Sequence, residues 1–423
     1  MELLKINLRL FGAETLINKT TSADTGNDLR PEMKTYYSNY LIDLVEPELV
    51  HDQFAQKHPI PKNGGKTIEF RKYDSLPKAL TPLTEGVTPT GNKLNVSTIE
   101  ATVAQYGDYI ALTDILMLTA IDNNLVEATK LLASQAGRTL DTVTREVLNG
   151  GTNVMYANGK TKRGELTGGD STAANNDVVR VLDLKKAVRA LKVQNAPKIN
   201  GAYAGIIHPD VEFDIMNDPE WKYPHQYKDT ENLYNNEIGM VAGIRFVEST
   251  EAKIFAEGEP FAEGIEYLTV SSYSSKVITV SDDITSAIAE AIVGKRILLA
   301  DGEEAEITAA TAKAGATAAT VTIKDTPSTN PAANDKIYPA GGGKEGRDVY
   351  STLIIGDNAY GVTEIAGGGL QHIVKQLGSS GTADPLNQRA TAGWKAIKTA
   401  ERLVEQYMIR LESVSSFDDI GAN

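Results

Sequence analysis

The side chains that could carry chemistry in this chain are its histidines and carboxylates, because the sequence contains no cysteine. That absence excludes disulfides, thiolate nucleophiles and cysteine-ligated metals. The five histidines lie far apart and show neither HExxH nor any other paired-ligand spacing, so we expect no metal site. They are His51, His58, His208, His225 and His372.

Hydrolytic chemistry has no motif in this sequence. Asp and Glu residues are scattered along the chain and could meet in space as a glycosidase pair, which a sequence does not show. The Gly-x-Ser-x-Gly motif of a nucleophile turn does not occur. We therefore expect no catalytic residue, and a soluble enzyme that uses carboxylates stays open as an alternative.

Two glycine-rich stretches resemble phosphate-binding loops. Residues 341–346 fit G-x-G-x-x-G, but a dinucleotide site needs a helix after the glycines, and residues 348–356 read as a strand. Residues 64–67 read GGKT, but Ile60 replaces the earlier glycine, and a strand follows where a helix must begin. We expect a linker at the first and a hairpin base at the second, and no cofactor.

The tripeptide His208-Pro209-Asp210 matches the signature of J-domain co-chaperones, which place it between two long helices. Here it follows residues 203–207, which read as a buried strand. Pro209 suits the first position of a helix, where its missing N–H is harmless. Asp210 then favours the positive helix end. The tripeptide predicts a turn that starts a short helix.

Length, composition and charge bound the class of protein. With 423 residues the chain is long enough for two or three domains, and 41% hydrophobic and 23% charged residues are ordinary for a globular protein. A net charge of −14 without a dense Lys/Arg block argues against gripping nucleic acid through the bulk surface. An acidic container around DNA is compatible with this sign of charge.

The first residues, MELLKINLRL, could be mistaken for a signal peptide. Lys5, Asn7 and Arg9 interrupt the apolar residues, so no continuous apolar segment of the needed length remains. The alternation predicts a short strand over residues 6–10. No run elsewhere approaches the ~18 apolar residues of a membrane span, so no membrane partner is expected.

Two predicted strands flank a long polar loop. Residues 67–73 form the first, and residues 96–112 contain its partner. The loop between them has no apolar run with which to build a core, and a strand pair this polar is not stable alone in water. We expect a neighbouring subunit to supply the missing surface. The expected contact residues are Pro77, Thr81, Pro82, Leu83, Glu85, Gly86 and Pro89.

A long helix is predicted next, because apolar residues recur at spacings of three and four from residue 125 to 147. Asn124 is a suitable cap, and residues 150–151, both glycine, end the pattern. About 25 residues at 1.5 Å each give a rod of roughly 37 Å. The residues expected to form the core face of this helix are Leu125, Leu132, Leu140, Val143 and Val147.

The remaining elements do not alternate as regular βαβ units, which favours an α+β architecture. Residues 32–57 and 177–194 read as helices, and residues 203–207 and 241–248 as strands. From residue 276 to 343 Ala, Thr, Asp and Gly dominate, and short strands alternate with turns. This composition predicts a small inserted β domain, and a long β-rich elaboration of the main sheet is the alternative.

Several stretches resemble the major capsid proteins of tailed phages, in the family named for coliphage N-four. The resemblance runs as ordered text through residues 62–145 and returns in DPLNQRATAGWKA, at residues 384–396. Residues 204–215 and 237–249 share it as well, whereas residues 276–343 do not.

The resemblance implies a Hong Kong 97-like capsid fold with an N-terminal arm, an extended β-hairpin loop that reaches over the next subunit, and a long spine helix. It implies that the chain assembles with itself, as hexamers and pentamers, into the icosahedral head shell of a tailed bacteriophage. Double-stranded DNA would be enclosed without sequence-specific binding. Further implied partners are portal, scaffold or decoration proteins. The implied location is the virion, with assembly in the host bacterial cytoplasm.

On this basis we divide the chain into seven parts. They are an N-terminal arm (1–31), a peripheral helical segment (32–66), the extended loop hairpin (67–112), the spine helix with a peripheral domain (113–175), the first part of an axial-type domain (176–275), the inserted β-rich surface domain (276–343), and the return to the main capsid fold (344–423). An encapsulin-like shell around enzyme cargo would share the fold class and is the first alternative function.

Overall fold

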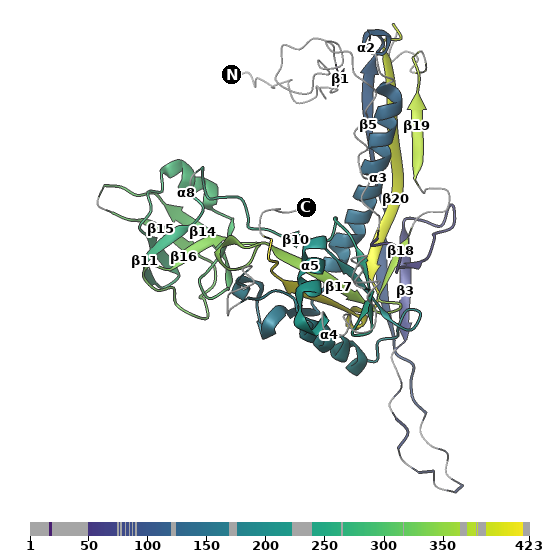
Figure 1. Cartoon of the computed structure of the whole chain (residues 1–423), viewed down its shortest axis with the longest axis horizontal. Helices are drawn as coiled ribbons and strands as arrows, with labels where there is room; N and C mark the ends of the chain where they lie inside the picture. The colour runs from purple at the N-terminus through teal and green to yellow at the C-terminus, as the bar shows by residue number, and fades with distance from the viewer. Residues whose placement is uncertain are drawn as a thin grey trace, which may run out of the picture.

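The computed structural model has mixed helices and strands, arranged as a body from which a long arm, a hairpin and a barrel project (Figure 1). It describes residues 17–18, 50–73, 76, 78–80, 82–83, 85–86, 88, 91–119, 124–168, 176–221, 239–263, 265–315, 317–363, 370–377, 379 and 386–417.

The centre of the body is a seven-stranded mixed sheet with the order β6-β21-β17-β7-β9-β8, in which β10 also pairs with β17. All seven residues of the central strand β17 (Val349–Ile355) are buried, as expected for a strand covered on both faces. The other strands are β6 (Val154–Tyr156), β7 (Tyr203–Ile207), β8 (Met240–Val241), β9 (Ile244–Glu248), β10 (Ile254–Phe255) and β21 (Met408–Ser413).

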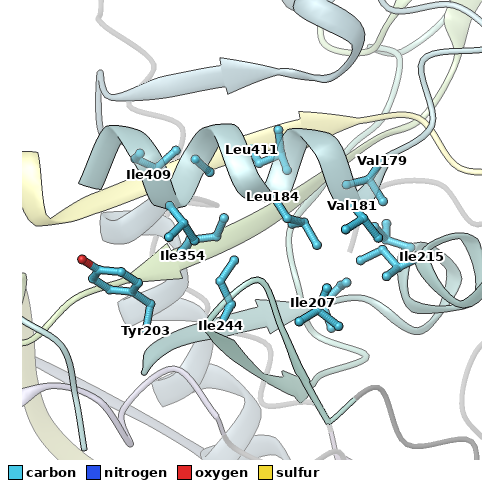
Figure 2. Close-up of a cluster of buried hydrophobic side chains, with 14 of the residues drawn as sticks. Val179, Val181, Leu184, Tyr203, Ile207, Ile215, Ile244, Ile354, Ile409 and Leu411 are labelled. Carbon is cyan, nitrogen blue, oxygen red and sulfur yellow. The ribbon is translucent and has the colours of Figure 1, made fainter. Parts of the chain in front are cut away.

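Helices α4 (Val181–Val193) and α5 (Pro209–Asn217) pack on one face of this sheet. Figure 2 shows Leu184 of α4 in one apolar cluster with Ile354 and Leu411 of the sheet and with Ile215 of α5. The opposite face packs against other segments, whose buried side chains include Val50, Leu148 and Tyr360. The sheet thus holds the main apolar core of the body.

The arm is built on β20 (Arg389–Arg402), which pairs along ten residues with β5 (Ala104–Thr113). β19 (Gln371–Lys375) and β18 (Tyr360–Thr363) pair in turn with the other edge of β20. Two-residue strands complete this sheet: β2 (Gln56–Lys57) pairs with β18, and β1 (Ile17–Asn18) with β5.

Helix α3 (Asn124–Asn149) lies along this sheet and is one continuous helix, as predicted from its periodicity. Its residues Leu132 and Ala136 are buried against Ala392, Trp394 and Ala396 of β20. Residues 392, 394 and 396 lie on the same face of β20, because side chains alternate between the two faces of a strand. Ala392 and Ala396 are small, so the helix comes close to the strand. The short helix α2 (Asp114–Thr119) connects β5 with the segment before α3.

A closed six-stranded barrel is inserted between β10 and β17, in the order β11-β12-β15-β14-β13-β16. Its core is continuous and aliphatic, and α8 (Ser286–Ile292) packs on it through Ala289 and Ile292. The strands are β11 (Leu268–Ser274), β12 (Val277–Val280), β13 (Arg296–Leu298), β14 (Glu304–Thr311), β15 (Ala319–Ile323) and β16 (Lys336–Pro339).

The predicted boundary of this insert was wrong at its start. Residue 276 falls in the turn between β11 and β12, whereas the barrel begins at Leu268. The polar residues at the end of β11 hid the strand, because its outward face is exposed. The predicted glycine linker is also wrong: a Cβ at Gly341 would lie 2.5 Å from the Ala256 oxygen, so the segment is packed tightly.

Two further predictions need correction. In the predicted helix over residues 32–57, only residues 50–57 are described, and they form a turn followed by β2. The predicted hairpin over residues 67–112 combined two different strands. Only β4 (Val96–Thr102) pairs with β3 (Thr67–Tyr73), while β5 turns away into the arm. The alternation of apolar and polar residues continues from β4 into β5, so the sequence pattern does not reveal that the two strands pair with different partners.

We predict that Leu132→Asp unfolds the arm, because Leu132 is 2% exposed at the contact between α3 and β20. An unpaired charge there should lower the free energy of unfolding by roughly 3 kcal/mol or more. Its neighbour Leu131 is 47% exposed, so Leu131→Asp is the matched control and should change stability by less than about 0.5 kcal/mol. Thermal melting checks both, and equal melting of the two variants would contradict this packing.

We also predict that the barrel can be excised only as a whole. Leu268 pairs with Ile337, so Tyr267 and Ala340, the two ends left by the excision, lie roughly 8 Å apart and a short Gly/Ser linker can join them. Replacing residues 268–339 should leave a folded body. Replacing residues 277–340 should yield aggregating protein, because β11 would lose both neighbouring strands. Solubility and circular dichroism distinguish the two; good folding of the second protein would show that β11 does not depend on the barrel.

Candidate subunit interface

The hairpin β3–β4 is anchored to the body only at its base. The strands pair from Thr67 with Thr102 to Tyr73 with Val96, and neither joins another sheet. At the base, Phe70 meets His58 edge to face with ring centroids 5.7 Å apart. Farther out the side chains become exposed, so this hairpin leaves the body as a polar two-stranded ribbon (Figure 1).

The described residues of the loop beyond the hairpin carry four exposed leucines. Leu76, Leu80, Leu83 and Leu94 are 54%, 83%, 78% and 69% exposed. Isolated exposed leucines are normal on a protein surface, but four on one projecting loop form an apolar surface that nothing in the described chain covers. Such a surface is suited to docking on another protein.

The predicted contact residues fall within this loop. Pro82, Leu83, Glu85 and Gly86 are exposed, and Gly86 has a φ of +80°, which an L side chain rarely adopts. Pro77, Thr81 and Pro89 lie outside the described residues. Whether these seven residues touch a neighbour stays a prediction.

The predicted core residues of the long helix lie at different depths. Leu132 is fully buried, while Leu140, Val143 and Val147 are half-buried, and the side chain of Leu125 lies outside the described residues. The most buried side chain near the helix end is Leu148, which contacts the body core. The apolar face therefore rotates from the arm sheet toward the body along the helix.

A buried polar cluster holds the C-terminal half of α3 in place, and no sequence motif predicts it. The backbone N–H of His51 donates to Asp141 Oδ1 at 2.9 Å, and His51 Nδ1 lies 2.6 Å from Asp141 Oδ2. Nearby, Lys398 Nζ donates to Asp52 Oδ2 at 2.5 Å, and Thr144 Oγ1 donates to Asp52 Oδ1 at 2.6 Å. These contacts join the segment around residue 51 to α3 and β20.

A second polar cluster lies where the barrel meets the body. Arg163 holds Glu412 with two hydrogen bonds of 2.7 Å, and Arg410 Nε lies 2.7 Å from the same carboxylate. The Arg163 guanidinium stacks 3.5 Å from the centroid of the Phe255 ring. Bidentate pairing of this kind gives strong geometric specificity. The burial of Glu412 at 0% exposure makes loss of either arginine costly.

The barrel also contacts the body directly through glycines. A Cβ at Gly164 would lie 2.7 Å from the Gly302 oxygen, and one at Gly302 would lie 2.7 Å from the Gly164 carbonyl carbon. No side chain fits between these two backbones, so the barrel is docked closely on the loop that carries Arg163.

Two glutamates have a raised pKa. Burial, with Glu266 and Asp348 nearby, raises the pKa of Glu257 to about 7. Burial, with Glu248 nearby, raises the pKa of Glu212 to about 7. A pKa near neutrality can suit a general acid, but neither Glu257 nor Glu212 is among the residues that line the grooves beside α3, β20 and α4.

The described part of the chain contains no group of three or more His, Asp or Glu side chains arranged to hold a metal ion. Within the same ranges, no helix has the length and apolar content that crossing a bilayer requires. The candidate functional features are therefore the three parts that project from the body: the hairpin loop, the arm and the barrel.

Comparison with known proteins gives a consistent result. Residues 96–286 match the family model described as phage capsid protein, a range from β4 to the start of α8. No curated protein matches the sequence.

Solved capsid structures share the fold over nearly the whole chain. The capsid of cyanophage P-SCSP1u has a TM-score of 0.55 at 12% identity, covering 94% of this chain and 97% of that one. The capsid of cyanophage Pam1 has a TM-score of 0.55 at 12% identity, covering 94% of this chain and 100% of that one. The capsid of Ralstonia phage GP4 has a TM-score of 0.51 at 13% identity, covering 95% and 100%.

The raised pKa of Glu257 predicts how stability depends on pH. Its ordinary value is 4.5 and its value in the fold is about 7, so the fold takes up a proton between these values. This contribution is complete below pH 4.5 and is lost as the pH rises through 7. We therefore expect the melting temperature to fall from about pH 5 to about pH 8.

The Glu257→Gln variant imitates the protonated acid, so its melting temperature should fall less over the same pH range. Glu263 is exposed on the same connecting segment, so Glu263→Gln is the matched control and should follow the unaltered chain. Parallel pH profiles of Glu257→Gln and the unaltered chain would show that Glu257 does not titrate in this window.

Proposed function

We propose that this chain, a major capsid protein of the phage capsid protein family, closes the icosahedral head of a tailed bacteriophage as hexamers and pentamers with a Hong Kong 97-like fold. The observation that carries the proposal is the hairpin loop with four exposed leucines, which projects from the body with no core of its own. In our proposal a neighbouring copy covers it, because an isolated two-stranded hairpin is at best marginally stable in water.

The arm supports the same proposal, because the residues that the structure describes cover its sheet on one face only. α3 packs on the face that holds Ala392, Trp394 and Ala396. On the other face, Tyr109 and Ile373 are 56% and 39% exposed. This face also carries Thr391 and Lys395, so it is a mixed surface with two large exposed apolar side chains, which is typical of protein–protein contacts. A neighbouring copy covers this face in our proposal.

Closed symmetry explains how such surfaces remain soluble. Each copy presents a loop that fits a different surface of the next copy, which is a heterologous contact. Contacts of this type close into rings when the rotation allows it, and otherwise extend without limit. In an icosahedral shell the loop of every copy is bound by a neighbouring copy.

The remaining roles follow from this assembly. The virion is the location of a capsid protein, and we place its assembly in the host cytoplasm. DNA lies inside without sequence-specific contacts, and portal, scaffold or decoration proteins complete the head. We place the barrel, residues 268–339, on the outer surface, where it obstructs neither neighbours nor DNA. We assign the chain no catalytic role.

We predict that deleting residues 81–91 leaves a folded subunit that forms no closed shells, because the loop contributes nothing to the subunit's own core. The double variant Leu80→Ser, Leu83→Ser should lower the yield of shells about tenfold while melting like the unaltered chain. Val293→Ser, at a 44% exposed site on the barrel, is the control and should assemble normally. Electron microscopy and sedimentation measure the yield; shells of normal number and size from the deletion variant would refute the proposed role of the loop.

A further inference from the structure

Helix α4 presents a row of cations to solvent. Lys185, Arg189 and Lys192 are exposed and stand at spacings of four and three, which places them on one side of the helix. They line a shallow groove of about 480 Å³ together with Val188, Val193 and Ala242, and no carboxylate is among the lining residues. This is a concentrated positive surface on a chain whose net charge is −14.

The charges in the groove are largely unneutralised. Lys185 pairs with Glu220 at 2.5 Å, but Arg189 and Lys192 form no ion pair within the described residues. Lys186, on a different side of the same helix, is paired with Asp183 at 2.8 Å. Two free cations beside a groove are available to an anionic partner.

The surroundings of the groove favour a protein as that partner. Val193 is 67% exposed, Leu182 on the same helix is 50% exposed, and Met240, two residues before Ala242, is 63% exposed. Methionine and arginine are enriched in protein–protein interfaces, and the buried core of an interface is more apolar than the rest of the surface. Phosphate backbones are bound instead by basic and polar groups.

The same body carries an acidic pair that lacks a cation. Glu212, in the first turn of α5, lies near Glu248 at the end of β9, and neither forms an ion pair within the described residues. Burial, with Glu248 nearby, raises the pKa of Glu212 to about 7, so ionising both carboxylates is unfavourable in a single copy. An added cation would relieve this repulsion.

The two charged surfaces lie at opposite ends of one strand. The groove includes Ala242, in the turn before β9, and the acidic pair includes the last residue of β9. Five residues of strand separate them by roughly 16 Å. One copy therefore cannot join its own groove to its own acidic pair, whereas the next copy in a ring can.

We propose that the cationic groove of α4 receives the Glu212–Glu248 pair of a second copy, in a head-to-tail contact that repeats around a ring. This inference rests on the proposed assembly of the chain into a shell. Copies with a charge of −14 repel one another, so local pairing of opposite charges must orient their approach. Arg189 and Lys192 are the residues that select the acidic pair.

Charge reversal tests this contact. Arg189→Glu with Lys192→Glu should lower the yield of shells about tenfold, because like charges would then face each other. Glu212→Lys with Glu248→Lys should lower it similarly. The chain with all four changes should regain most of the yield, since every contact again joins opposite charges. Lys186→Glu, on the same helix but outside the groove, is the control and should assemble normally. Melting and circular dichroism confirm that each variant is folded.

The outcomes separate this inference from the proposed function. If the unaltered chain forms no shells, the proposed function fails and this contact with it. If the unaltered chain and the Arg189→Glu, Lys192→Glu variant form shells equally well, the contact alone is refuted. If the folded four-change chain stays as poor as the two-change chains, the groove binds something other than the acidic pair, and the inference is overturned.

Discussion

The whole arrangement depends on one constraint: the apolar face of a sheet must be covered, and the described residues cover only the α3 side of the arm sheet. α3 buries the alternating residues of β20, and Tyr109 and Ile373 remain open on the other side. The hairpin loop has the same deficit, with four exposed leucines and no core. The body, in contrast, buries both faces of its central sheet. The apolar side chains are thus buried at the centre of the subunit, whereas some remain exposed on the arm and the hairpin loop.

The sequence predicts the elements whose apolar pattern has a single period. α3, α4 and β17 were predicted within a few residues, because each packs one regular face or lies fully inside. The mixed architecture and the exposed loop also followed from sequence. The hairpin and the arm strand were merged, since a strand keeps its alternation when it changes partner. The clusters around Asp141 and Glu412 were missed because their partners lie far apart in the chain.

The polar clusters explain why this assembly of parts is specific. Arg163, Glu412 and Phe255 come from three distant segments, and their geometry is satisfied in one arrangement only. The glycine contact between residues 164 and 302 adds a steric condition that any larger residue would violate. The buried ions hold the loop that carries Arg163, and Gly164 of the same loop makes the close backbone contact with Gly302 of the barrel.

β20 is a single uninterrupted strand of fourteen residues, roughly 48 Å long, that belongs to the arm at one end and to the body at the other. Its cross-strand hydrogen bonds lie perpendicular to its length. A pull along the arm would therefore load many of these bonds in shear at once, rather than opening them one after another. β20 therefore carries tension between the arm and the body, and the chain resists stretching along the length of the arm.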